Sequence, residues 1–191
     1  MRNGHLFVIS APSGAGKSTV LSCVRKRLED LEFSVSYTTR GIRGDESDGV
    51  EYHFVDRARF EAMTRAGDFL EWAQVHGELY GTPRAPIEEA TDAGRDVLMD
   101  IDVQGGMSIK DEFPEAVTVF LLPPDTQELK QRLSGRATDN PEQIKLRLAN
   151  AGREMAFADR YDHRIINDRV ERACDELCDL IRGMREGGGR G

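Results

Sequence analysis

The stretch LFVISAPSGAGKST, from Leu6 to Thr19, decides the fold that we expect for this chain. Its first five residues, Leu6 to Ser10, are mostly apolar and predict a buried strand. The turn that follows is rich in glycine and small residues, and it leads into a helix that begins near Gly16. A buried strand, a glycine-rich turn and a helix in this order are the setting that a phosphate-binding loop requires.

The residues of the turn suit that role chemically. Gly14 and Gly16 lack a Cβ, so the backbone can curl and present successive N–H groups to an anion beside the positive end of the helix. Lys17 would reach the β- and γ-phosphates, and the Ser18 hydroxyl would hold Mg²⁺. The strict motif has glycine where Ala11 stands, a departure that we expect to be tolerated because later residues make the anion contacts. The plain alternative is a tight turn that binds nothing.

Length and charge limit the class of protein. A chain of 191 residues fits one α/β domain with inserted subdomains. The net charge of −8, from 34 acidic and 26 basic residues, argues against a nucleic acid as the main partner. The apolar run near the N-terminus is too short for a secretory signal, and no run approaches the ~20 residues of a membrane span. We therefore expect a cytoplasmic protein that does not bind membranes.

The three cysteines give no disulfide framework. Cys23 falls in the first predicted helix, and Cys174 and Cys178 stand four residues apart in the last one. We expect buried, reduced thiols, because no further Cys or His set accompanies the Cys174 and Cys178 pair to hold a metal.

Periodicity and capping signals predict the other elements. The predicted strands are 33–37, 52–55, two short antiparallel strands within 68–83, 96–102, 116–122 and 163–167. The predicted helices are 18–29, 57–66, 85–93, 103–112, one capped by Asp125, one that begins at Pro141, and 170–185. Apolar strands that alternate with helices predict an α/β fold with a parallel core sheet, and the antiparallel pair indicates a smaller subdomain.

Several charged residues are candidates for a site. Arg40 and Arg43 lie three residues apart in a glycine-punctuated loop, which suits an anion clamp or, equally, a solvated loop. Glu71 stands between Leu70 and Trp72 on an alternating strand, where it is either partly buried and in need of a donor or simply turned to water.

Two further carboxylates follow an apolar strand. Asp100 ends this strand, where a second element of a phosphate-loop site usually lies, close to Ser18 and the metal. Asp102 points the same way if the strand continues, and the alternative is that it caps the next helix.

Three arginines, Arg132, Arg136 and Arg147, flank a short polar loop on both sides. This placement suits a lid that closes over phosphates, whereas charged helix faces are usually only solvated.

Taken in order, the motifs SAPSGAGKST, SVSYTTRGIRGDESDGVEYHFV, FLEWAQVHGELYGTP, DVLMDIDVQGG, LSGRATDN and RIIND resemble those of the guanylate kinase family, from about Leu6 to Arg185. The resemblance implies a phosphate-loop nucleoside-monophosphate-kinase fold. It has a parallel core sheet flanked by helices (1–33, 94–125 and 160–186), an inserted mixed α/β GMP-binding subdomain (34–93), a lid (126–159) and a disordered tail (187–191).

The resemblance also implies roles for single residues. Those that match the guanine-reading positions are Ser36, Glu71, Thr82 and Asp102, with Thr82 in place of a frequent serine, and those that match the GMP-phosphate positions are Arg40, Arg43, Tyr52 and Tyr80. The ATP-side residues are Ser13, Gly14, Ala15, Gly16, Lys17, Ser18, Thr19, Arg132, Arg136, Arg147 and, near the adenine, Asn167. Lys17, Arg43, Arg136 and Arg147 would be catalytic, and Ser18 and Asp100 would hold Mg²⁺.

The implied reaction is transfer of the γ-phosphoryl group of ATP to GMP, which gives ADP and GDP. The implied partners are thus two small molecules; dGMP as a second acceptor and a homo-oligomer stay open. An alternative from another class is a guanylate-kinase-like interaction module that has lost catalysis, but such a module would be expected to have a degraded nucleotide loop. A kinase for a phosphorylated sugar is a third reading, and it would leave the guanine-reading set without a purpose.

Overall fold

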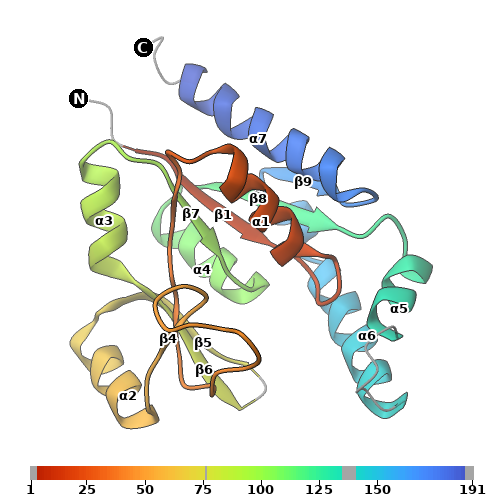
Figure 1. Cartoon of the computed structure of the whole chain (residues 1–191), viewed down its shortest axis with the longest axis horizontal. Helices are drawn as coiled ribbons and strands as arrows, with labels where there is room; N and C mark the ends of the chain where they lie inside the picture. Colours follow the sequence, from red (N-terminus) through yellow and green to blue (C-terminus); the bar gives the residue numbers. More distant parts are fainter. Residues whose placement is uncertain (1–3, 76, 135–140, 188–191) are drawn as a thin grey trace.

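The fold was analysed in a computed structural model that describes residues 4–75, 77–134 and 141–187 (Figure 1). Our predictions for the loop at 135–140 and for the tail at 188–191 concern residues outside these ranges. Gly187, which we expected in the tail, is instead the last residue of a helix. Within the described ranges, no helix combines the length and the apolar character needed to cross a membrane.

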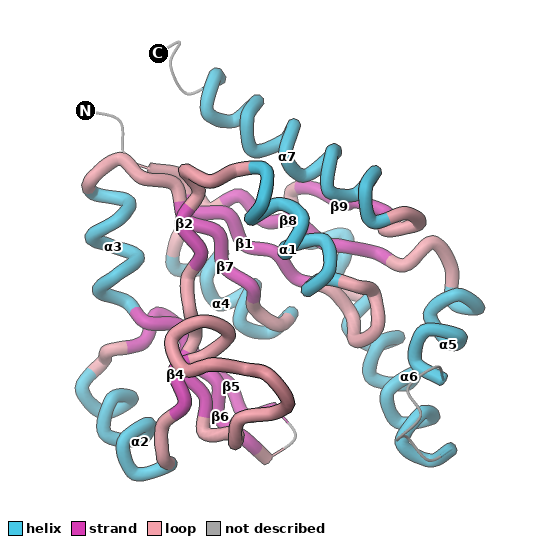
Figure 2. Tube along the Cα trace, in the orientation of Figure 1, coloured by secondary structure: helices cyan, strands magenta, loops and turns pink. Residues whose placement is uncertain are grey.

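The core is a sheet of five parallel strands in the order β2-β7-β1-β8-β9 (Figure 2). The strands are β1 (Leu6–Ser10), β2 (Glu32–Phe33), β7 (Val97–Asp100), β8 (Val117–Leu122) and β9 (His163–Ile166). Because β1 lies in the middle, its carboxyl end opens between β7 and β8, which is where ligands bind in open parallel sheets.

Helices cover both faces of this sheet, as the apolar strands predict. Phe7 and Ile9 of β1 pack in one cluster with α1 (Lys17–Arg27) and α7 (Val170–Gly187). The alternate residues Leu6 and Val8 pack on the other face, in a cluster with residues of α3 (Arg84–Asp92) and α4 (Val103–Glu112). The predicted parallel α/β core is confirmed.

A second sheet of four strands forms the inserted subdomain, in the order β4-β3-β6-β5. Its elements are β3 (Tyr37–Thr38), β4 (His53–Phe54), β5 (Phe69–Val75), β6 (Glu78–Pro83) and the helix α2 (Arg57–Ala66). The antiparallel β5 and β6 pair is confirmed, whereas the single strand predicted at 33–37 is wrong. Residues 32–33 belong to the core sheet and residues 37–38 to the second sheet, so the chain crosses between the two sheets at this point.

A third group of helices lies beside the phosphate loop (Figure 1). It contains α5 (Thr126–Ser134), α6 (Pro141–Met155) and a 3-10 turn at Ala158–Arg160. The predicted cap of α5 is confirmed, because the Asp125 carboxylate accepts the Glu128 N–H at 2.7 Å. Buried Leu129, Leu133 and Ala151 hold α5 against α6.

The cysteines differ from our expectation. Cys23 of α1 and Cys174 of α7 are joined as a disulfide across 151 residues, so they are not separate reduced thiols, and Cys174 is not paired with Cys178 as a metal site. Cys178 is free and buried, and burial raises the pKa of its thiol. The pairing depends on how α1 packs against α7, which no spacing along the chain encodes.

Candidate functional site

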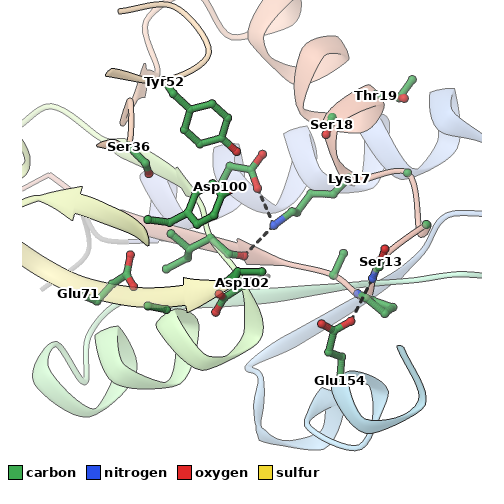
Figure 3. A pocket seen from close by; sticks show the side chains of 18 of the residues that line it. Ser13, Lys17, Ser18, Thr19, Ser36, Tyr52, Glu71, Asp100, Asp102 and Glu154 are labelled. Carbon is green, nitrogen blue, oxygen red and sulfur yellow. Dashed lines mark hydrogen bonds and ion pairs between the residues drawn. The ribbon is translucent and has the colours of Figure 1, made fainter. Parts of the chain in front are cut away.

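A cavity of about 620 Å³ lies between the phosphate loop, the carboxyl end of β7 and the second sheet (Figure 3). Its lining comes from all of these parts: the loop and start of α1 (Ala11, Pro12, Ser13, Gly14, Gly16, Lys17, Ser18, Thr19), the end of β7 and its following residues (Asp100, Ile101, Asp102), the subdomain (Ser36, Tyr52, Glu71, Ala73, Val75, Tyr80) and the third helical group (Arg132, Glu154). The fold thus brings most of the predicted site residues to one cavity.

The phosphate loop has the backbone that its glycines predict. Gly14 and Gly16 have φ angles of 88° and 87°, which an L side chain rarely adopts. Space is also short, since a Cβ on Gly16 would lie 2.6 Å from Asn167 Nδ2 and one on Gly14 would lie 2.8 Å from Leu133 Cδ2. The loop is therefore both curled by its glycines and held closely by its neighbours.

Lys17 is engaged by the end of β7. Its Nζ lies 2.6 Å from Asp100 Oδ1 and donates to the Ile101 carbonyl at 2.7 Å. In Figure 3 the Lys17 side chain points toward Asp100, and Ser18 and Thr19 lie in the first turn of α1 at the cavity edge. Asp100 and Ser18 share this cavity, as the sequence predicts.

Asn167 and Arg132 support the loop from outside. The buried Asn167 amide donates to the Ala15 carbonyl at 2.7 Å, and Arg132 donates to the Asn167 carbonyl at 3.1 Å and to the Ala15 carbonyl at 3.4 Å. Arg132 lines the cavity, whereas Asn167 is absent from its described lining. Both residues therefore hold the loop in shape, and the place of Asn167 beside an adenine stays a prediction.

Helix α6 contacts the loop through two side chains of opposite charge. Arg147 Nη2 donates to Ser13 Oγ at 3.1 Å, and Glu154 Oε2 accepts the Ser13 N–H at 3.1 Å. Arg136, which we predict as a third arginine of this region, lies outside the described residues. Glu154 was not among the predicted site residues.

Glu71 forms the other end of the cavity. Its Oε1 accepts the Thr82 hydroxyl at 2.5 Å, and a Cβ on Gly105 would lie 2.7 Å from its Oε2, so the carboxylate packs directly on the start of α4. Burial, with a smaller contribution from Asp102, raises the pKa of Glu71 to about 7, although the Thr82 hydrogen bond opposes the shift. Glu71 is thus a partly buried carboxylate and not an ordinary exposed one.

Asp102 does not extend the strand, because β7 ends at Asp100. Its carboxylate caps α4 by accepting the Gly105 N–H at 2.8 Å. The alternative that the sequence left open is therefore correct, and the assumed continuation of the strand is wrong. Asp102 still lines the cavity near Glu71.

Arg40 is held by a carboxylate that sequence reasoning missed. Both of its terminal nitrogens donate to Glu46, at 2.8 Å each, and this contact raises the pKa of Arg40 and lowers that of Glu46. The guanidinium also lies 5.3 Å from the centre of the Tyr52 ring, and Tyr52 packs edge-on against Tyr80. Burial raises the pKa of Tyr52 to about 12.

Arg43 lies on the exposed part of the same loop, and its N–H donates to Glu46 at 2.8 Å. Among the described residues that line the cavity are Tyr52 and Tyr80 but neither Arg40 nor Arg43. In this structure Arg40 thus adjoins the cavity through Tyr52, and Arg43 lies outside the described lining.

Spacing could have indicated both missed carboxylates. Glu46 follows Arg43 by three residues in a short loop, close enough to accept its backbone N–H. Glu154 follows Arg147 by seven residues, which is two helical turns and hence the same face of α6.

The described residues contain no group of three or more His, Cys, Asp or Glu side chains that could hold a metal by themselves. The oxygen atoms of Ser18 and Asp100 are the hard ligands that Mg²⁺ prefers, and both lie in the cavity. They fit a cation that would take its remaining ligands from water and from a bound phosphate.

A parallel sheet whose central strand runs through a glycine-curled loop into α1, with lysine and serine at the start of that helix, defines a nucleotide-binding protein of the phosphate-loop class. The second sheet contributes the Glu71 carboxylate to the lining of the same cavity.

Comparison with known proteins places the chain within this class. The family model for guanylate kinase matches residues 3–184. A guanylate kinase from Nocardia farcinica is 50% identical over 182 residues, which cover 94% of each chain, and one from Mycobacterium leprae is 46% identical over 186 residues, which cover 96% of this chain and 89% of that protein. The crystal structure of guanylate kinase from Anaplasma phagocytophilum superposes with a TM-score of 0.78 at 30% identity, over 96% of this chain and 87% of that one. The chain belongs to the guanylate kinase family.

The environment of Glu71 predicts a pH-dependent cost to stability. Its pKa rises from 4.5 to about 7 on folding, so the folded protein keeps a proton that the unfolded chain loses, and stability falls as pH rises from about 4.5 through about 7. The Glu71→Gln variant does not titrate there, so above pH 7 it should exceed the wild type by about 2 to 3 kcal/mol in unfolding free energy, with no such gain at pH 4.5. Urea denaturation at both pH values measures this difference.

The matched control is Glu89→Gln, which removes an exposed carboxylate from α3. A gain at Glu71→Gln that is the same at pH 4.5 and pH 8 would show that the carboxylate titrates normally.

Proposed function

We propose that this chain catalyses transfer of the γ-phosphoryl group from ATP to GMP, which yields ADP and GDP. The observation that carries the proposal is the single cavity with a phosphate loop at one end and the Glu71 carboxylate at the other. Phosphoryl transfer needs two anions held in line with the charge between them neutralised, and little covalent help. A site of this shape holds a donor and an acceptor at once.

Recognition of the acceptor base rests on Glu71. Guanine presents N1–H and N2–H as adjacent donors, and an ionised carboxylate can accept both. Adenine presents an acceptor at N1, so it would set an acceptor against the buried carboxylate where guanine offers a donor. Thr82 already donates to one Glu71 oxygen, which fixes the carboxylate, and Ser36 and Asp102 line the same cavity.

The phosphate of GMP would lie against Tyr52 and Tyr80, with Arg40 and Arg43 as its positive partners. Glu46 keeps the Arg40 guanidinium over the Tyr52 ring in this structure, so the arginine is positioned before any ligand arrives. A phosphate oxygen of GMP attacks the γ-phosphorus, the bond to the bridging oxygen of ADP breaks, and the electron pair stays with ADP. That oxygen is already ionised at neutral pH, so no side chain has to act as a general base.

The donor phosphates would take the N–H groups from Ser13 to Thr19, with Lys17 exchanging Asp100 for a phosphate oxygen. Arg132, Arg136 and Arg147 are proposed to neutralise charge that develops on the transferred group. Mg²⁺, held by Ser18 and Asp100, would supply further charge neutralisation.

We further propose that the protein acts in the cytoplasm, where both nucleotides serve purine nucleotide metabolism and GMP is recycled. dGMP is a candidate second acceptor, because none of the proposed contacts involves the ribose 2′-hydroxyl.

The direct test is a coupled ADP-release assay with GMP, AMP, dGMP and ribose 5-phosphate as acceptors. We expect ADP release with GMP and little with AMP or the sugar phosphate. A folded Lys17→Ala variant should lose turnover by orders of magnitude, because the lysine charge acts on the phosphates and contributes little packing. Equal rates with all acceptors, or none with GMP, would contradict the proposal.

Replacement of Glu71 tests how the base is chosen. Glu71→Gln keeps the volume but offers one acceptor and turns an NH₂ toward a donor, so kcat/KM for GMP should fall at least roughly a hundredfold. Activity with AMP should not fall in step, because adenine N1 can accept from the new amide. The quantity to measure is the GMP-to-AMP ratio of kcat/KM under the same Mg·ATP.

Glu78→Gln is the matched control, since Glu78 lies in the same sheet, accepts from Thr39 at 2.7 Å and does not belong to the described cavity lining. It should leave the ratio unchanged. If Glu71→Gln also leaves it unchanged, the base is read elsewhere.

The arginine pair predicts a selective defect. Arg40→Ala and Arg43→Ala each remove a charge-assisted contact to the GMP phosphate, so KM for GMP should rise about tenfold or more while KM for ATP changes little. Arg65→Ala, on the exposed face of α2 in the same subdomain, is the control and should change neither value. Steady-state kinetics with each substrate varied in turn provide the measurement. If KM rises equally for both substrates, the two arginines do not bind the GMP phosphate selectively and the prediction is wrong.

A further inference from the structure

Glu154 of α6 contacts the phosphate loop, although the sequence analysis did not single it out. Its Oε2 accepts the Ser13 N–H at 3.1 Å, and its side chain lines the cavity together with Lys17 and Ser18 (Figure 3). The residue comes from α6, 141 positions further along the chain. A carboxylate from a different part of the fold thus holds one of the N–H groups at the mouth of the loop.

That position favours an anion. The loop is curled at Gly14 and Gly16, and it runs into the N-terminus of α1, whose dipole adds positive potential. Lys17 and Arg147 place two more positive groups within the same region, since Arg147 donates to the Ser13 hydroxyl at 3.1 Å. A carboxylate there makes a charge-assisted hydrogen bond, the same kind of contact that a phosphate oxygen would make.

We infer that Glu154 is an internal competitor for the donor site: its carboxylate stands in for a phosphate oxygen at the Ser13 N–H and must leave when a nucleoside triphosphate binds. The inference rests on the proposed nucleotide site. A donor phosphate brings further negative charge to the same N–H, so it cannot share this place with the carboxylate. Arg147 lies two turns away on the same helix face, and its contact with the Ser13 hydroxyl does not involve the Ser13 N–H, so it does not have to change when Glu154 leaves.

The cost of displacement appears as weaker apparent binding. If the loop is free of the carboxylate for only a fraction of the time, the apparent Kd for the donor is the intrinsic Kd divided by that fraction. A charge-assisted hydrogen bond at a partly exposed position shifts this equilibrium by about tenfold, equivalent to about 1.4 kcal/mol. Removal of the carboxylate should therefore tighten donor binding, whereas removal of a purely structural support would weaken it.

The experiment is calorimetric titration of ATP and of inorganic tripolyphosphate, without GMP, into the wild type, Glu154→Gln and Glu154→Ala. The amide of Glu154→Gln still accepts the Ser13 N–H without a charge, so the loop keeps its shape. We expect the Kd for both probes to fall by about threefold in Glu154→Gln and about tenfold in Glu154→Ala. Asp159→Asn removes one exposed negative charge five residues away, next to Arg164 and outside the described cavity lining, and should leave both Kd values unchanged.

Binding of GMP provides a second readout. The same calorimetric titration with GMP in place of the two probes reports the acceptor end. The Kd for GMP should stay the same in both variants. If Glu154→Gln and Glu154→Ala bind the probes as the wild type does, or more weakly, Glu154 is only a brace and the inference is overturned. If the wild type binds neither probe, the proposed nucleotide site itself is wrong and the inference falls with it.

Discussion

The site depends on one constraint: the N–H groups of a short loop after β1 must stay open toward a cavity while the loop itself stays rigid. Positive φ angles at Gly14 and Gly16 turn the backbone. Asn167 supports the loop by donating to the Ala15 carbonyl, and it lies so close to Gly16 that even a methyl group would not fit. The loop is thus organised before any ligand binds, which reduces the ordering cost of binding.

In this structure, three groups that could bind a substrate anion are already paired with internal carboxylates. Lys17 pairs with Asp100, the guanidinium of Arg40 with Glu46, and the loop N–H of Ser13 with Glu154. Unpaired positive groups and partly buried N–H groups are costly, so these contacts stabilise the protein without its substrates. These contacts have two different consequences for binding. Glu46 holds Arg40 in position beside the Tyr52 ring, whereas Glu154, at the Ser13 N–H, would have to leave when a donor phosphate binds.

The sequence predicted correctly those elements whose signals lie within a few residues of one another. The β1 strand, the loop and α1 follow from apolar periodicity and glycine placement, and the start of α5 follows from the Asp125 cap, because each signal acts within a few residues. The errors arise where tertiary structure decides. Nothing in 33–37 shows that the chain leaves one sheet and enters another, and the Cys23 and Cys174 pair needs two helices to pack across 151 residues. The spacing of Glu154 from Arg147 indicates a shared helix face, but only the tertiary structure shows that this face lies against Ser13.

The position of Glu71 links the subdomain to the core. The preceding residues of β5 belong to two different hydrophobic clusters, since Phe69 packs with Phe60 inside the subdomain and Leu70 packs with core residues such as Ile87. Glu71 follows directly and rests on Gly105 at the start of α4, so it lies where the two parts meet and not at the outer end of the second sheet. Arg40 follows β3 and Tyr52 precedes β4, and β6 separates these two strands from β5 in the second sheet. A base held by Glu71 would therefore be positioned relative to the core and its phosphate loop.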